Sequence, residues 1–342
     1  MSSADPLLQR QAMTHKLETQ IACEGKFTLP AVPALVGEYT TRCEQIFAAL
    51  GRKLSVKEKD HLQETLANQI EIAFKASQRS SVTISYSAAG SGLINYLITP
   101  NHASIATTYD GWVSTRQPPY FGVEPDAKAM AVAKKMSGPA NCRVLDIGAG
   151  TGRNALPLAR LGHTVDAVEL TPKFADLLVK AAQDEYLPIQ VICEDVFKAN
   201  HHLNNDYQMM LVSEVVSDFR SIDQLRALLE LAAQCLANGG KLVMNAFIAR
   251  AHYSEDDAAR QFGQQVYSAF FSESELHAAM RDLPLDLISN ESVHDYEQAN
   301  LPKGAWPPTT WYANWTSGLD IFATAIENSP VSLRWLVLQK RN

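Results

Sequence analysis

Two hydrophobic patterns divide the chain. From residue 142 onward, short apolar runs alternate with stretches in which apolar residues recur every three or four positions. This alternation predicts β-strands joined by crossover helices in a parallel sheet. The predicted strands are residues 143–147, 164–170, 189–193, 208–212 and 241–247.

The first hundred residues follow another pattern. Residues 7–80 are predicted to be helical, with one helix ending before Gly51 and a second beginning at Ser55, where Glu58 completes a capping box. Residues 81–100 alternate with a period of two around a glycine-containing loop, which predicts a β-hairpin. We therefore predict a mainly helical N-terminal extension with a β-hairpin over residues 1–108 and an α/β domain over 109–342.

The α/β region is centred on a glycine-rich turn after its first strand. Asp146 precedes Gly148, Gly150 and Gly152 in a D-x-G-x-G-x-G pattern. Alternating glycines let the backbone turn sharply and leave room for a ligand against bare peptide. Glu169 ends the second strand about 20 residues further on, where an acidic side chain usually binds the hydroxyls of a ribose.

This motif resembles that of the class I S-adenosylmethionine (SAM)-dependent methyltransferases. The run 152–155, followed by Gly162, His163 and Glu169, is similar to the small-molecule branch around tellurite-resistance and thiopurine methyltransferases. A dehydrogenase would space its glycines as G-x-G-x-x-G, so an NAD-dependent oxidoreductase is the less favoured reading. The resemblance covers residues 109–339 and does not include the extension.

The resemblance implies a fold, a cofactor and a reaction. The fold is a Rossmann-like, seven-stranded, mostly parallel sheet that ends in an antiparallel hairpin, for which residues 318–325 and 333–338 are the candidates. The cofactor is SAM, which becomes S-adenosylhomocysteine. The implied enzyme methylates a small organic acceptor, such as a specialised metabolite. A peptide or protein side chain is the nearest alternative, and a non-catalytic SAM-binding scaffold is another.

Candidate cofactor residues follow the ends of the predicted strands. Glu169 is expected to bind the ribose, and the glycine turn to contact the methionine end of SAM. The resemblance places Asp195 at the adenine amino group and the Val196 N–H at a ring nitrogen. The full predicted set is Tyr120, Asp146, Gly148, Ala149, Gly150, Asn154, Glu169, Leu170, Asp195, Val196 and Ser213.

The acceptor side is expected after the fourth strand and in the aromatic stretch 296–315. That stretch suits either the wall of an acceptor pocket or a loop that its large side chains pin to the core. No Asn-Pro-Pro-Tyr tetrad follows the fourth strand, so the acceptor atom stays open. Methyl transfer is an in-line displacement that positioning and desolvation can promote without a base. The catalytic candidates are Glu214 and Tyr312, and the acceptor-binding candidates are Val215, Asp218, Arg220 and Trp311.

Composition limits the partners. The 342 residues carry a net charge of -7 and no lysine or arginine run, which disfavours nucleic acid. The absence of a signal-peptide pattern and of a long apolar run predicts a cytoplasmic protein without a membrane span. Five scattered cysteines predict buried thiols in a reducing compartment. The extension is open to three roles: a cap, a lid, or an oligomerisation element that forms a homodimer.

No metal site is predicted. His163, His201 and His202 lack partners at metal-ligand spacing and are expected to lie on the surface or in turns.

Overall fold

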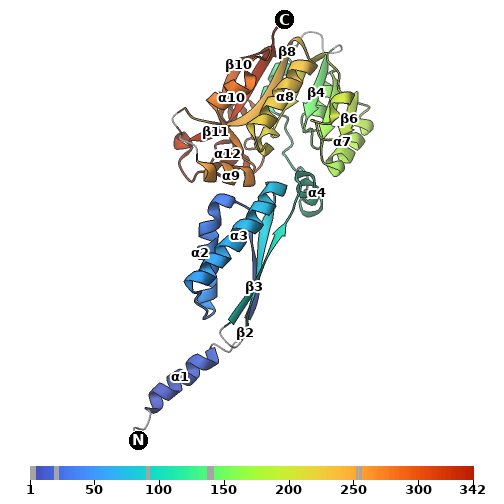
Figure 1. Cartoon of the computed structure of the whole chain (residues 1–342). Helices are drawn as coiled ribbons and strands as arrows, with labels where there is room; N and C mark the ends of the chain where they lie inside the picture. The colour runs from blue at the N-terminus through green and yellow to red at the C-terminus, as the bar shows by residue number, and fades with distance from the viewer. Residues whose placement is uncertain (1–4, 19–22, 90–92, 137–141, 252, 254–255) are drawn as a thin grey trace. The chain divides into compact units, whose positions relative to one another are not determined.

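The computed structural model describes residues 5–18, 23–89, 93–136, 142–251, 253 and 256–342 (Figure 1). The chain divides into two units, Met1–Ile105 and Ala106–Asn342. From the sequence we expected the division after residue 108. Each unit has its own hydrophobic core.

The first unit is a three-stranded antiparallel sheet, in the order β1-β2-β3, that packs against two helices. Phe47 of α2, Leu66 of α3 and Ile84 of the central strand β2 are buried in one hydrophobic cluster. The elements of this unit are α1 (Pro6–Glu18), β1 (Cys23–Pro30), η1 (Pro33–Leu35), α2 (Val36–Ala49), α3 (Val56–Ala76), β2 (Ser81–Ala89) and β3 (Leu93–Asn101).

The helical prediction is confirmed for α2 and α3 and is wrong for β1. Ser55 and Glu58 form the expected capping box at the start of α3, and Gly51 follows α2 with φ 81°. In β1, by contrast, half-buried and exposed positions alternate, and Phe27 and Leu29 pack against the core of this unit. That period of two matches a strand, which pairs with β2. The predicted hairpin loop at 90–92 lies outside the described residues.

The second unit is built on an eight-stranded sheet, as the resemblance predicted in outline. The strand order is β10-β11-β8-β7-β4-β5-β6, with β9 beside β8. The pairs among β4 to β9 are parallel, whereas β11 runs antiparallel to both β8 and β10. Its strands are β4 (Arg143–Ile147), β5 (Thr164–Glu169), β6 (Ile189–Cys193), β7 (Tyr207–Val212), β8 (Leu236–Ala249), β9 (Phe270–Ser272), β10 (Leu285–Ser292) and β11 (Val331–Lys340).

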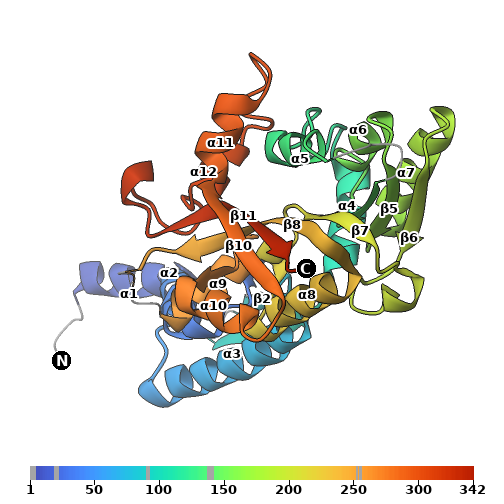
Figure 2. The ribbon, with the colours of Figure 1, turned by 90° about the horizontal axis from the view of Figure 1, so that it is seen from above.

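Helices cover both faces of this sheet. Leu145 and Met210 pack with α8 and α10 on one face, whereas Val144 and Met209 pack with α5, α6 and α12 on the other. Figure 2 shows α5 and α11 side by side. The helices are α4 (Ile105–Thr115), α5 (Ala127–Ala133), α6 (Ala155–Arg160), α7 (Pro172–Asp184), η3 (Ala199–His202), η4 (Val216–Asp218), α8 (Ile222–Cys235), α9 (Asp257–Gln265), α10 (Glu273–Met280), α11 (Val293–Asn300), α12 (Tyr312–Thr316) and η5 (Ile326–Asn328).

The antiparallel terminal hairpin is confirmed, but its first strand is not the predicted segment 318–325. That strand is β10, whereas residues 318–325 form turns and irregular structure. β10 lies at the sheet edge and carries an irregularity between Leu287 and Ser289, which weakens its hydrophobic pattern. Gly318 has φ 77°, and a Cβ at this residue would clash with the carbonyl oxygen of Val331. The apolar run after Gly318 therefore packs as a turn against β11.

Three smaller expectations can be compared with the structure. Cys43, Cys142 and Cys235 are buried, but Cys193 is exposed, contrary to expectation. His163 lies in the turn before β5, and its side chain is buried. Within the described part of the chain, no helix is both long and apolar enough to cross a membrane.

Candidate cofactor and active site

The glycine turn joins β4 to α6 and is held by the end of β5. The Gly148 and Ala149 N–H groups donate to the Val168 carbonyl oxygen at 2.8 and 3.1 Å. The Gly150 N–H donates to Oε2 of Glu169 at 2.8 Å. These bonds place the bare backbone of the turn beside the tip of β5, at the point where strand order reverses and ligands of such sheets bind.

Glu169 is buried, with 6% of its surface exposed. Its second oxygen, Oε1, accepts from the Thr171 N–H at 2.7 Å. Burial raises the pKa of Glu169, and the N–H donors of Thr171 and Gly150 act in the opposite direction. The carboxylate is therefore fixed at the strand end, where the sequence predicted a ribose-binding acid.

Asp146 lies at the end of β4 and is buried, with 2% of its surface exposed. Its Oδ2 atom has no hydrogen-bond partner among the described residues. Burial, followed by the charge of Asp126, raises the pKa of Asp146 to about 8. A buried polar atom without a partner is costly. This orphaned oxygen fits the amino group at the methionine end of SAM, either directly or through water.

Two side chains lie against the turn itself. Gly148 has φ 72°, and a Cβ at this position would clash with a methyl group of Val215, which follows β7. A Cβ on Gly150 would lie 3.3 Å from the ring of Phe121. Tyr120 is the predicted cofactor residue of this aromatic segment, but the neighbouring Phe121 is the side chain that approaches the turn at Gly150.

The adenine side is predicted at the end of β6. Asp195 is half-buried, and its Oδ1 accepts from the Phe197 N–H at 3.0 Å. Val196 is buried, and Leu170, beyond β5, is 40% exposed. The carboxylate of Asp195 is oriented by its own loop, and its contact with adenine stays a prediction.

A buried ionic cluster is centred on Asp126, just before α5, and includes Glu214 of the predicted acceptor side. Asp126 accepts hydrogen bonds from Arg153 Nη1 at 2.6 Å, Asn154 Nδ2 at 2.8 Å and Ser213 Oγ at 2.7 Å. Arg153 Nη2 also donates to Oε1 of Glu214 at 2.6 Å. The cluster therefore ties the segment before α5 to the glycine turn and to the end of β7.

Two predicted cofactor ligands, Asn154 and Ser213, are members of this cluster. The Oδ1 atom of Asn154 accepts from the Asp126 N–H at 2.9 Å, so both ends of its amide are taken by Asp126. Ser213 Oγ also accepts from Asn245 Nδ2 at 3.2 Å. The Asn154 amide keeps a second N–H and a second lone pair, and Ser213 Oγ keeps one lone pair, so a direct contact of either side chain with SAM stays a prediction.

Glu214 is held in an unusual backbone conformation. Its φ is 61°, and its N–H donates to Oδ1 of Asn245 at 2.7 Å. Strained residues of this kind cluster at functional sites. Burial raises the pKa of Glu214 to about 7, while the guanidinium of Arg153 acts to lower it. A carboxylate with this pKa suits proton transfer near neutrality.

Tyr312 is buried in the same region, and its hydroxyl has no hydrogen-bond partner in the part of the chain that the structure describes. Burial, followed by the charges of Asp126 and Glu214, raises the pKa of this phenol well above its usual value. Tyr312 therefore keeps its proton and can donate a hydrogen bond. The ring of Trp311 lies 5.8 Å from that of Tyr312 between centroids.

The remaining predicted residues have contacts that the sequence did not indicate. Asp218 Oδ2 accepts from the Tyr109 hydroxyl at 3.0 Å, which ties α4 to η4. Arg220 is half-buried, and burial lowers its pKa. Tyr120 packs on α7, with its ring 5.5 Å from that of Phe174. The roles predicted for these residues at a ligand remain predictions.

Sequence reasoning missed Asp126, Arg153, Asn245 and Glu297. Glu297 is buried and accepts from the Ala127 N–H at 2.8 Å. Arg153 could have been predicted, because it lies within the glycine motif and a positive charge there implies an acidic partner. The others carry no local signal, because their partners lie far away in the chain.

Comparison with known proteins agrees with this geometry. Residues 144–240 match the family model described as "Methyltransferase domain". This part of the chain is similar to the methyltransferase domains of that family. The matched residues include the glycine turn, Glu169, Asp195 and Glu214, and the match supports both the predicted enzyme class and SAM as the cofactor. The likeness to the tellurite-resistance and thiopurine branch stays a prediction.

Individual relatives are distant. "Hemagglutinin 1" of Eikenella corrodens is 26% identical over 155 residues, 45% of this chain and 48% of that protein. The match thus spans about half the length of that curated relative. A solved geranyl diphosphate methyltransferase in complex with SAM has a TM-score of 0.50 and 14% identity over 64% of this chain and 85% of its own. A geranyl diphosphate C-methyltransferase from Streptomyces coelicolor has a TM-score of 0.47 and 13% identity over 63% and 80%.

Proposed function

We propose that this chain is a SAM-dependent methyltransferase that transfers a methyl group to a small organic acceptor. The observation that carries the proposal is the bond between the Gly150 N–H and Glu169, within residues that match a methyltransferase domain. The antiparallel β11 beside β8 supports this reading over an NAD-dependent oxidoreductase.

The cofactor would extend along the ends of three parallel strands. SAM supplies a positively charged sulfonium whose methyl group is open to in-line attack. Glu169 would bind the ribose, Asp195 and Val196 the adenine, and the glycine turn the amino-acid end. Asp146, with its orphaned oxygen, would accept a hydrogen bond from the amino group at that end. The negative charges of Asp126 and Glu214 against the single positive charge of Arg153 favour a cationic cofactor.

The acceptor would lie on the side of Glu214 and Tyr312. Tyr312 would orient the acceptor by donating a hydrogen bond to it. Glu214 would act as the base that takes the proton from the acceptor. Since a base must be ionised, the rate of transfer would rise as the pH passes about 7, the pKa of Glu214. The rest of the rate would come from alignment of donor and acceptor.

We take a small molecule as the acceptor class. The name of the solved neighbour, a geranyl diphosphate methyltransferase, supports this class. A peptide or protein side chain is the nearest alternative. The N-terminal unit is proposed as a cap, a lid or a homodimer contact; light scattering of the whole chain tests the last role.

Calorimetric titration with SAM, S-adenosylhomocysteine and NAD tests the cofactor. Glu169→Ala should weaken binding of SAM and S-adenosylhomocysteine by about 1–3 kcal/mol, the scale of a lost hydrogen bond to a charged group. Asp184→Ala, which removes an exposed acid at the end of α7, should leave the affinity unchanged. Binding of NAD instead of SAM would point to an oxidoreductase. If none of the three binds, a non-catalytic scaffold is the remaining interpretation.

A further inference from the structure

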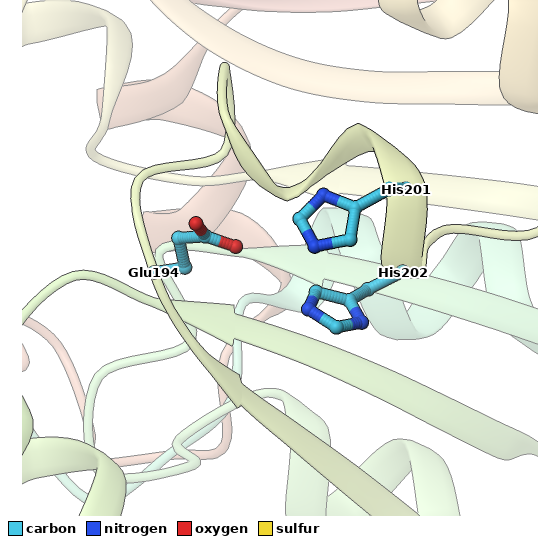
Figure 3. Close-up of side chains that lie close together, drawn as sticks. All are labelled: Glu194, His201 and His202. Atoms are coloured by element: carbon cyan, nitrogen blue, oxygen red, sulfur yellow. The ribbon is translucent and has the colours of Figure 1, made fainter.

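A group of metal-ligating side chains lies outside the contacts described above. Glu194 follows β6, the edge strand of the sheet, and His201 and His202 end η3. One ligand atom from each of the three lies within 4.8 Å of the others. Figure 3 shows the Glu194 carboxylate facing the two imidazole rings. We propose that these three side chains bind a zinc ion.

The loop between β6 and η3 brings the ligands together. The Lys198 and Ala199 N–H groups donate to the carbonyl oxygen of Asp195 at 2.8 and 3.0 Å, which folds the chain back on itself. The rings of His201 and His202 have their centroids 3.9 Å apart. Two ligands of one zinc ion, each about 2.1 Å from it, lie roughly 3.4 Å apart in a tetrahedral site. Because the ligand atoms of the three side chains already lie within 4.8 Å of one another, small rotations of the side chains would bring them to this spacing.

His201 is already set to bind a metal through one of its nitrogens. Its Nδ1 atom lies 3.1 Å from the carbonyl oxygen of Lys198. A carbonyl can only accept, so Nδ1 carries the hydrogen of this bond, and in the neutral ring Nε2 has the lone pair that binds a metal. Metal-binding histidines typically donate their other N–H to a carbonyl or a carboxylate in this way, which fixes the tautomer and the orientation of the ring.

The donor set selects the class of metal. Two imidazoles and one carboxylate suit zinc, whereas calcium and magnesium prefer oxygen ligands. Three protein ligands leave a fourth position of a tetrahedral ion to water, and both histidines are exposed to solvent. Because the histidines are exposed, an ion could bind them without any movement of the hydrophobic core. A bound ion would cross-link the two ends of the loop that carries Asp195 and Val196.

The test is calorimetric titration of the whole, chelator-treated chain with zinc chloride. The unmodified chain should bind one zinc ion at this site, and His201→Ala and Glu194→Gln should each weaken that binding at least tenfold. His277→Ala is the matched control, because His277 is an exposed histidine on α10, outside the cluster. Equal binding by the unmodified chain and His201→Ala would overturn the proposal, as would an equal loss in His277→Ala.

Thermal unfolding separates metal binding from folding. Without metal, His201→Ala should melt at the temperature of the unmodified chain, because this side chain is exposed. Zinc should raise the melting temperature of the unmodified chain and of His277→Ala, since a ligand that binds only the folded state stabilises it. It should not raise that of His201→Ala. An equal rise in His201→Ala would show that zinc binds elsewhere and would overturn the proposal.

Discussion

Arg153 in the glycine turn donates a 2.6 Å hydrogen bond to Glu214, the residue that follows Ser213 at the end of β7. The side chains of this pair are only 9% and 14% exposed. The same guanidinium binds Asp126 at 2.6 Å. One buried cation thus pairs with two carboxylates and connects the predicted cofactor turn to the predicted acceptor side.

Arg153→Ala should be strongly destabilising. It would leave Asp126 and Glu214 buried without their cation, and breaking a buried pair from one side typically costs about 3–5 kcal/mol. The free energy of unfolding from urea titration measures the loss.

An exposed ion pair provides the control for Arg153. Arg160 pairs with Glu185, and their side chains are 49% and 41% exposed. Arg160→Ala should cost no more than about 1 kcal/mol, because solvent screens such pairs. Similar losses in the two variants would contradict the importance assigned to the buried cluster.

The central strands could be predicted from the sequence because helices cover both faces of the sheet. Such strands form continuous apolar runs, and the central strand β4 begins and ends where its run predicted. Edge strands carry a weaker signal. β1 alternates between half-buried and exposed positions, and β10 contains an irregularity, so neither forms an apolar run.

The site could be predicted only where one local segment carries it. The turn and Glu169 belong to a motif of fixed spacing, and the structure joins them through Gly150. Asp126 joins Arg153, Asn154 and Ser213 from 27, 28 and 87 positions away. Contacts of that separation depend on how the strands are ordered, which a single sequence does not reveal.

Asp146 should make stability depend on pH. Its pKa is about 8 in the folded chain against an ordinary value of 3.8, so the folded state holds a proton that the unfolded state releases. The free energy of unfolding should fall as the pH rises from about 4 to about 8, by up to roughly 6 kcal/mol. Asp146→Asn, which cannot ionise, should remove the Asp146 contribution and make this dependence shallower, with Glu214 supplying part of what remains. Identical slopes for the two proteins in urea titrations at pH 5 and pH 8 would contradict the prediction.

Gly148→Ala should weaken both folding and cofactor binding. A methyl group here would clash with Val215, and φ 72° is strained for alanine, so we expect a loss of about 1–3 kcal/mol. Gly37 in α2 is the control, because no atom lies within 4 Å of the Cβ position there. Gly37→Ala should stabilise the chain by about 0.4–1 kcal/mol. Unfolding midpoints and calorimetric titration with SAM measure both effects, and unchanged SAM binding in Gly148→Ala would speak against the turn as the cofactor site.

Tyr312→Phe should separate function from stability. The Tyr312 hydroxyl has no partner among the described residues, so its removal should leave the free energy of unfolding unchanged or raise it by about 1 kcal/mol. Tyr207→Phe is the matched control, because the Tyr207 hydroxyl donates to Asp166 at 2.7 Å. Loss of that bond should cost about 1–3 kcal/mol, since Asp166 is buried. Urea titration of the two variants decides between a ligand-facing hydroxyl and a structural one at residue 312. A loss in Tyr312→Phe as large as that in Tyr207→Phe would mean that this hydroxyl holds the fold together and is not kept for the acceptor.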